Sequence, residues 1–201
     1  MIKKILIATK NPGKAREYCQ IFEPKGFEVI TLLDLDPQKI PPIDENGKSF
    51  TENAMIKAEA LEKALGVTIL ADDSGLCVDA LNGAPGIHTA RYGGDHDYPA
   101  GRAKLLKNLE GVPAAKRSAH FHTSIVVLHP DKKALVVSGD ANGFILDHEE
   151  GKDGFGYDPL FYSSNLKKTF AQATIQEKNS VSHRGKAVRK LMQQFDNWWQ
   201  D

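Results

Sequence analysis

Three short apolar runs alternate with two helix-like segments at the start of the chain, and this order constrains the fold more than any other feature. The runs that predict buried strands cover residues 2–9, 27–32 and 67–71. Asn11-Pro12 supplies a cap and a first-turn proline for the helix after the first run. Ser49-x-x-Glu52 has the pattern of a capping box for the helix after the second run. Strands that alternate with helices predict an α/β fold.

The pattern changes after a long loop (82–98) and a predicted helix (about 99–110). Residues 119–128 and 133–145 have the composition of long strands, and His129-Pro130-Asp131 between them is a hairpin signal. An antiparallel section at about 115–150 is therefore expected, which makes the sheet mixed. The third run leads into Asp72, and residues 76–81 are a candidate further strand. A last helix is predicted over 179–199.

Charge and cysteine content exclude several classes of protein. Lys plus Arg and Asp plus Glu each number 26, so the net charge is zero. We therefore expect no nucleic-acid partner and no attraction to an anionic membrane. No apolar stretch is long enough to span a membrane. Cys19 and Cys77 form no CxxC or zinc spacing, which favours buried thiols and a reducing cytoplasm.

A loop with phosphate-binding character joins the first strand to the first helix. Its residues are Thr9, Lys10, Asn11, Pro12, Gly13 and Lys14. A helix start presents free N–H groups and the positive end of the helix dipole, and two lysines add charge. The string is not a Walker A motif, so no P-loop fold is expected. The alternative is an ordinary strand–turn–helix connection.

Two acidic pairs are candidates for a metal centre. Asp72 and Asp73 follow an apolar run, and in a strand they would point to opposite faces. Asp44-Glu45 lies in a loop rich in proline and acidic residues. Mg²⁺ takes one or two carboxylates together with phosphates and waters, and a carboxylate can also accept a proton from water. The alternatives are a turn at 73–75 and a solvated acidic loop.

Basic and aromatic residues form a second set of candidates. In the segment 154–159 two aromatic residues stand between glycines, where a ring can stack on a base; a turn with core aromatics is the alternative. His183 and Arg184 stand at a predicted helix start, which disfavours cations and therefore indicates a function such as binding phosphate or a purine oxygen. A surface pair is the alternative. Lys57 is either a solvated lysine or a cation beside Glu45.

Six sequence blocks occur in an order that resembles one enzyme family. The blocks are TKNPGK (9–14), SFTENAMIKA (49–58), ADDSGL (71–76), GAPGIHTARY (83–92), GFGYDP (154–159) and SHRGKA (182–187). They resemble the inosine/xanthosine triphosphate pyrophosphatases, house-cleaning enzymes for deaminated purine nucleotides, over about residues 2–195. Lys10 and Asn82-Gly83 depart from frequent family residues, and nothing is carried over for the variable segment 93–102.

The resemblance implies a fold, an activity and an assembly. The fold would be an elongated, two-lobed α/β domain over 1–201, in which helices flank a long mixed sheet and the active-site cleft lies between the lobes. The activity would be Mg²⁺-dependent hydrolysis of ITP, dITP and XTP at the α-phosphorus, giving the monophosphate and pyrophosphate. The protein would be a cytoplasmic homodimer.

The resemblance also implies residue roles. Thr9, Lys10, Asn11, Pro12, Gly13, Lys14 and Lys57 would hold the triphosphate. Glu45 and Asp73 would hold Mg²⁺ with a contribution from Asp72, Asp73 would accept the proton, and Ser74 would contact the substrate. Phe155, Gly156, Tyr157, Asp158, Lys178, His183 and Arg184 would line the purine pocket.

Two other functions remain open at this stage. One is a pyrophosphatase for modified pyrimidine nucleotides on a related fold, which would share the acidic centre and differ in the base pocket. The other is a nucleotide-binding sensor without catalysis, which the full set of acidic residues disfavours.

Overall fold

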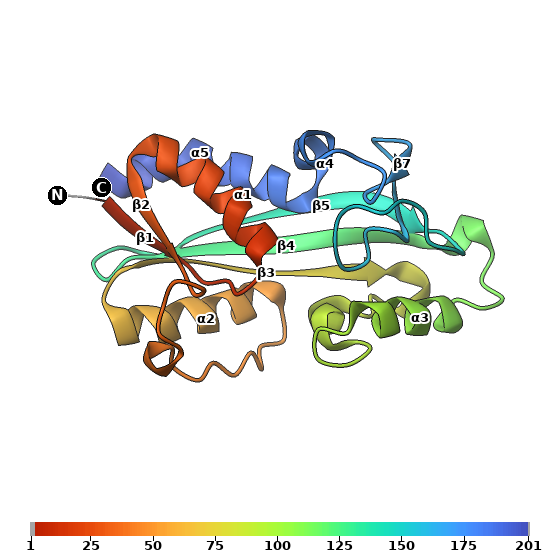
Figure 1. Ribbon diagram of the computed structural model, residues 1–201, viewed down its shortest axis with the longest axis horizontal. Helices are drawn as coiled ribbons and strands as arrows, with labels where there is room; N and C mark the ends of the chain where they lie inside the picture. The colour runs from red at the N-terminus through yellow and green to blue at the C-terminus, as the bar shows by residue number, and fades with distance from the viewer. Residues whose placement is uncertain (1–2, 201) are drawn as a thin grey trace. The chain divides into compact units, whose positions relative to one another are not determined.

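The computed structural model describes residues 3–200 (Figure 1). Its contacts divide the chain into two compact units. Unit 1 contains Met1–Asp73, Ser124–Val137 and Leu191–Asp201. Unit 2 contains Ser74–Thr123 and Ser138–Lys190. The single domain and the cleft between lobes that the resemblance implies stay predictions.

Seven strands form one mixed sheet in the order β2-β1-β3-β4-β5-β6-β7. They are β1 (Lys3–Ile7), β2 (Phe27–Thr31), β3 (Thr68–Val78), β4 (Ser118–Leu128), β5 (Leu135–Ile145), β6 (Phe161–Ser163) and β7 (Lys168–Thr169). β1 is parallel to β2 and to β3, whereas β6 is antiparallel to β5 and to β7. β4 and β5 are neighbours joined by a short connection, which only an antiparallel pair permits. The predicted α/β fold with a mixed sheet is confirmed.

Within residues 3–200, five α-helices accompany the sheet. They are α1 (Pro12–Phe22), α2 (Phe50–Leu65), α3 (Tyr98–Asn108), α4 (Ile175–Val181) and α5 (His183–Gln200). Short 3₁₀ turns cover Glu23–Lys25, Pro37–Lys39, Asp79–Leu81, Gly86–Arg91 and Ala114–Lys116. Within residues 3–200, no helix is long and apolar enough to cross a membrane.

Unit 1 packs α1 and α2 against opposite faces of its strands (Figure 1). The apolar stripe of α2 is buried against alternate residues of β1 and β3; this cluster includes Leu6, Ala54, Ala58, Leu61, Ile69 and Ala71. The predicted Asn11 cap begins α1, and Gly66 ends α2 in the left-handed conformation. The α2 helix is therefore packed against β3, which carries the acidic residues.

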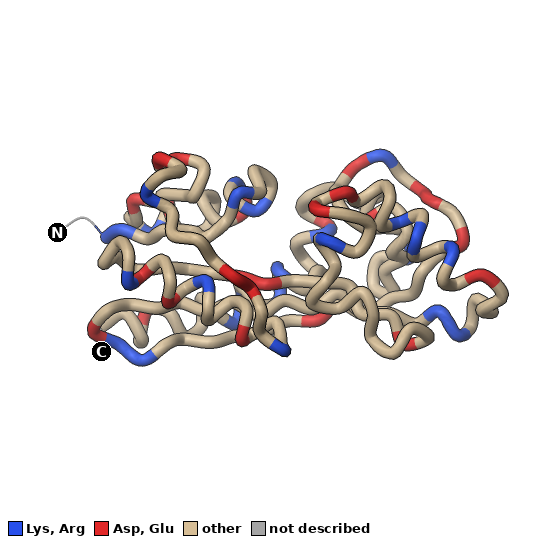
Figure 2. Tube along the Cα trace, turned by 90° about the horizontal axis from the view of Figure 1, so that it is seen from below, with Lys and Arg blue, Asp and Glu red and all other residues tan. Residues whose placement is uncertain are grey.

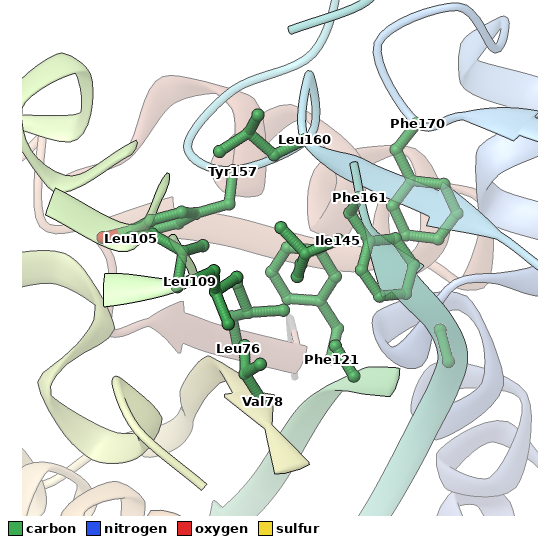
Figure 3. Close-up of a cluster of buried hydrophobic side chains, with 12 residues drawn as sticks. Leu76, Val78, Leu105, Leu109, Phe121, Ile145, Tyr157, Leu160, Phe161 and Phe170 are labelled. Atoms are coloured by element: carbon green, nitrogen blue, oxygen red, sulfur yellow. The ribbon is translucent and has the colours of Figure 1, made fainter. Parts of the chain in front are cut away.

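Unit 2 has its own core, which anchors the segment after Gly154. Figure 3 shows Tyr157 beside Leu105 of α3 and Leu160, and Phe161 beside Phe170. The Phe161 and Phe170 ring centroids lie 4.9 Å apart, and Tyr157 is fully buried. The core thus holds the residue that follows Gly156.

The structure corrects the predicted end of the third strand. Residues 72–75 were expected to form a strand end or a turn, but β3 runs without interruption from Thr68 to Val78. β3 lies between β1 and β4, and sheet pairing outweighs the local turn tendency of Asp-Ser-Gly. The two aspartates therefore lie in the middle of a strand.

Two helix predictions also need correction. The Ser49 hydroxyl caps α2 as expected, but the Glu52 carboxylate accepts the N–H of Lys48 at 2.6 Å instead of that of Ser49. The predicted helix over 179–199 is broken at Ser182, whose backbone is extended. The Ser182 hydroxyl accepts the N–H of Gly185 at 3.1 Å and so restarts the helix. Lys178 consequently lies inside α4, not before a helix.

Candidate active site

The two aspartates of β3, Asp72 and Asp73, accept hydrogen bonds from side chains of two different helices. Strand alternation turns the two side chains to opposite faces of the sheet. Asp72, whose side chain is 2% exposed, accepts a hydrogen bond of 2.8 Å from the Lys14 ammonium of α1. Asp73 accepts a hydrogen bond of 3.1 Å from the Asn53 amide of α2. The predicted opposite orientation of the two carboxylates is confirmed.

Lys57 connects the acidic loop to β3. It lies one helical turn after Asn53, so both side chains leave the same face of α2. Its ammonium lies 3.1 Å from a Glu45 carboxylate oxygen and donates to the Asp72 carbonyl oxygen at 3.2 Å. Lys57 is therefore the cation beside Glu45, and the reading as a solvated lysine is wrong.

Asn53 is a site residue that the sequence analysis did not identify. Its amide nitrogen donates to Asp73, and its amide oxygen accepts the N–H of Gly47 at 2.8 Å. A Cβ at Gly47 would lie 2.7 Å from that oxygen, so this approach requires glycine. Asn53 is 1% exposed, and an asparagine in the buried stripe of a helix was the available signal, because asparagine is a weak helix former.

The surroundings of Asp73 favour its protonated form. Burial raises the pKa of Asp73 above its usual value, and the negative charge of Glu45 raises this pKa further. The Asn53 hydrogen bond and the positive charges of Lys57 and Lys14 lower it, but burial dominates. A carboxylate with a raised pKa is a better proton acceptor than an ordinary exposed aspartate.

The carboxylates fit a magnesium ion that is shared with a substrate. Among residues 3–200, no three Asp, Glu, His or Cys side chains are grouped as a closed metal site would require. Glu45 lies close enough to Asp73 for its negative charge to raise the pKa of Asp73, while Asp72 is paired with Lys14. Two carboxylates suffice for Mg²⁺, which takes its other ligands from phosphates and waters. The metal role of Asp72 stays a prediction.

The loop before α1 differs from its prediction in one respect. The expected free N–H groups are occupied: the Asn11 side chain accepts from Gly13 N–H at 2.8 Å and Lys14 N–H at 3.2 Å, and the Thr9 hydroxyl accepts from Asn11 N–H at 3.1 Å. This turn is therefore preorganised by its own residues. Positive charge at the helix start comes from the Lys10 and Lys14 side chains and from the helix dipole.

In unit 2, a buried ion pair holds the aromatic turn. One Asp158 carboxylate oxygen accepts the Phe155 N–H at 2.8 Å and the Lys178 ammonium at 2.6 Å. The same ammonium lies 4.4 Å from the centroid of the Phe155 ring. Gly154 has a φ of +80°, and a Cβ there would overlap the Asp158 carboxylate. The contacts of Asp158 thus hold the turn in shape.

His183 and Arg184 begin α5 and are buried, so the reading as a surface pair is wrong. The His183 ring stacks on Phe121 with centroids 4.9 Å apart. The Arg184 guanidinium carbon lies 5.9 Å from the centroid of Phe155. Lys178 and Arg184 therefore both lie near Phe155, one of the two aromatic residues predicted as candidates for stacking on a base.

The remaining predicted contact, Ser74, follows Asp73 on β3. Its hydroxyl lies 2.8 Å from that of Thr123 on β4, within unit 2.

Figure 2 shows Lys and Arg interspersed with Asp and Glu along the trace of both units. The charged residues of the candidate site therefore form local ion pairs, and they do not belong to a segment of uniformly positive or negative charge.

The fold and these clusters define a class of α/β protein with a mixed sheet. One unit carries a group of carboxylates paired with lysines, and the other carries an aromatic turn that is held by an ion pair between a lysine and an aspartate. A family model described as the Ham1 family matches residues 5–194. The chain belongs to the Ham1 family.

Similar proteins agree with this assignment. A "dITP/XTP pyrophosphatase" of Lactiplantibacillus plantarum is 51% identical over 195 residues, covering 97% of this chain and 96% of that protein. The solved Ham1 protein of Staphylococcus aureus has a TM-score of 0.87 at 41% identity, and that of Coxiella burnetii has 0.88 at 36%. Each comparison with these two structures covers 97% of this chain and 99% of the other.

Proposed function

We propose that this protein hydrolyses the deaminated purine nucleotides ITP, dITP and XTP to the monophosphate and pyrophosphate. Membership of the Ham1 family and the 51% identical dITP/XTP pyrophosphatase support this activity. The observation that carries the proposal is the partly buried centre in which Asn53 donates to Asp73 while Lys57 pairs with Glu45. No feature of the described residues favours the modified-pyrimidine or sensor alternative over this one.

The triphosphate is assigned to the cationic groups of unit 1. Lys14 and Lys57 are already oriented by Asp72 and Glu45, so little side-chain freedom is lost when they bind an anion. Lys10, Thr9, Asn11, Pro12 and Gly13 complete the proposed phosphate contacts at the start of α1, and Ser74 is a further contact. Preorganised positive charge stabilises the pyrophosphate leaving group.

Glu45 and Asp73 are the proposed ligands of Mg²⁺. When bound, the ion would supply charge stabilisation to the phosphate oxygens. Asp73 accepts the proton of the attacking water, whose oxygen forms a bond to the α-phosphorus. The bond from that phosphorus to the bridging oxygen breaks, and pyrophosphate leaves.

The purine is assigned to the aromatic turn and the start of α5. Phe155 offers a ring for stacking, near the positive charges of Lys178 and Arg184. Hypoxanthine and xanthine carry an oxygen at C6 that accepts hydrogen bonds, whereas the amino group of adenine donates. Donors from His183, Arg184 or the backbone would therefore be left unpaired by adenine. Gly156, Tyr157 and Asp158 shape this pocket.

We also propose a homodimer in the cytoplasm. The family resemblance supports the dimer, and light scattering after size-exclusion chromatography tests it. The two free thiols, Cys19 and Cys77, support a reducing compartment.

The activity is tested with ITP, XTP, GTP and ATP in parallel, with Mg²⁺ and with EDTA. Pyrophosphate release from ITP and XTP should exceed that from ATP and should require the metal. Asp73→Asn should lower kcat by about three orders of magnitude or more without unfolding the protein. Equal turnover of ATP and ITP would contradict the purine assignment.

A further inference from the structure

Arg102 touches the recognition turn from a segment that belongs to none of the sequence blocks. It lies on α3, and its guanidinium donates to the Gly156 carbonyl oxygen at 2.8 Å. The same guanidinium donates through Nε to Glu149 at 2.7 Å. The Arg102 side chain is 16% exposed and its hydrogen bond to Gly156 is partly buried, whereas the Glu149 side chain is 45% exposed.

The peptide that Arg102 holds is the adaptable part of the turn. Tyr157 is anchored in the core, with its hydroxyl donating to the Thr89 carbonyl at 3.3 Å. Asp158 is fixed by Lys178. Gly156 lies between Phe155 and Tyr157 with a φ of +63° and has no side chain to pack, so its conformation depends on contacts to its backbone.

Neighbouring contacts fix Arg102 itself. The preceding residue, Gly101, lies so close to the Tyr157 hydroxyl that a Cβ there would overlap it, which sets the register of α3 against the turn. Glu149 is followed by Glu150, whose N–H donates to the Pro159 carbonyl at 2.9 Å just beyond the turn. The planar guanidinium can thus span two acceptors in a fixed direction.

We propose that Arg102 is a positioning residue for base selectivity. It fixes the Gly156 carbonyl and with it the placement of the Phe155 ring and backbone, while it is not itself a proposed contact of the nucleotide. This role rests on the proposed function. It predicts that loss of Arg102 weakens discrimination between keto and amino purines more than it slows the chemical step.

The test compares Arg102→Met with Lys107→Met, which removes the same charge from an exposed position on the same helix. In Arg102→Met, the KM for ITP should rise roughly tenfold, kcat should stay within about threefold, and the ITP-to-ATP ratio of kcat/KM should fall roughly tenfold. Hydrogen exchange in a peptide spanning 150–160 should become faster. Lys107→Met should match the wild type in each measurement.

An active Arg102→Met with the wild-type ITP-to-ATP ratio would overturn the inference, as would equal losses on both nucleotides. If Arg102→Met does not fold, Arg102→Lys is tested in its place, because a single ammonium cannot reproduce the planar, forked donor geometry of the guanidinium. The ITP-to-ATP ratio of kcat/KM should fall in this variant as well. An unchanged ratio in Arg102→Lys would overturn the proposed positioning role. A wild type that releases no pyrophosphate from ITP would overturn the proposed function itself, which separates the two failures.

Discussion

The Asn53 amide donates to the Asp73 carboxylate at 3.1 Å and at the same time accepts the N–H of Gly47, so one buried side chain joins α2, β3 and the loop that carries Glu45. Asn53 therefore contacts one proposed metal ligand, Asp73, directly, and it contacts the loop of the other ligand, Glu45, through Gly47. Asn53 connects the fold of unit 1 to its proposed chemistry.

Asn53→Ala should impair both catalysis and stability. Loss of the hydrogen bonds should cost about 1–3 kcal/mol of unfolding free energy, because buried polar groups lose their partners. Displacement of Asp73 should lower kcat for ITP by up to about 100-fold. Glu59→Ala, at an exposed position of the same helix, is the matched control. Wild-type kcat in a folded Asn53→Ala protein would contradict the positioning role.

The raised pKa of Asp73 predicts how stability depends on pH without metal. Since the folded pKa lies above the unfolded value, near 3.8, Asp73 contributes stability below pH 3.8 that is lost as the pH rises through the folded pKa. Relative to Asp73→Asn, the wild type in EDTA should therefore become less stable over that window and level off above it, as urea titrations at a series of pH values can measure.

Asp34 provides a control in which stability should change with pH in the opposite direction. Hydrogen bonds from the Thr31 side chain and backbone lower the pKa of Asp34 below its usual value. Relative to Asp34→Asn, the wild type should thus lose stability as the pH falls below about 3.8. If the Asp73 comparison showed the same slope as the Asp34 comparison, the assigned direction would be wrong.

The pair formed by Lys14 and Asp72 should matter for stability as well as for substrate binding. Lys14→Met leaves a buried carboxylate without its cation, which should cost about 3 kcal/mol in urea unfolding. The double variant Lys14→Met/Asp72→Asn should recover more than half of this loss, because no buried charge remains. Lys10→Met, at an exposed position, should leave the free energy of unfolding unchanged. Equal stability of the Lys14 and Lys10 variants would refute the role of the pair.

Several features of the fold follow from local sequence. The Asn11-Pro12 start of α1 was predicted correctly, because a helix cap depends on a few adjacent residues. The continuation of β3 through Asp73 was missed, since it depends on strands that are distant in sequence. The break at Ser182 was missed because no proline marks it between residues 179 and 199.

The site residues, like the elements of the fold, include some that local sequence indicates and some that depend on contacts between distant parts of the chain. Lys57 and Glu45 were candidates by residue type, and their contact is confirmed. Asn53 was not identified, because its two partners, Gly47 and Asp73, lie on different elements that only the folded chain brings together. Arg102 gives no signal in sequence, since its acceptor is the backbone of Gly156 and any residue supplies a carbonyl.

Glu45→Gln should separate metal binding from folding. Removing one of two carboxylates should raise the Mg²⁺ concentration needed for half-maximal activity by roughly tenfold or more. Asp44→Asn, the exposed neighbour, is the control and should leave this concentration unchanged. A magnesium titration of ITP hydrolysis measures both, and the same half-maximal concentration in Glu45→Gln and wild type would remove Glu45 from the metal site.

The position of bond cleavage tests the central claim most directly. ITP is hydrolysed in ¹⁸O-labelled water, and the products are separated and analysed by mass spectrometry. Attack at the α-phosphorus predicts IMP that carries one ¹⁸O atom together with unlabelled pyrophosphate. Label in pyrophosphate, or IDP and inorganic phosphate as products, would contradict the proposed chemistry.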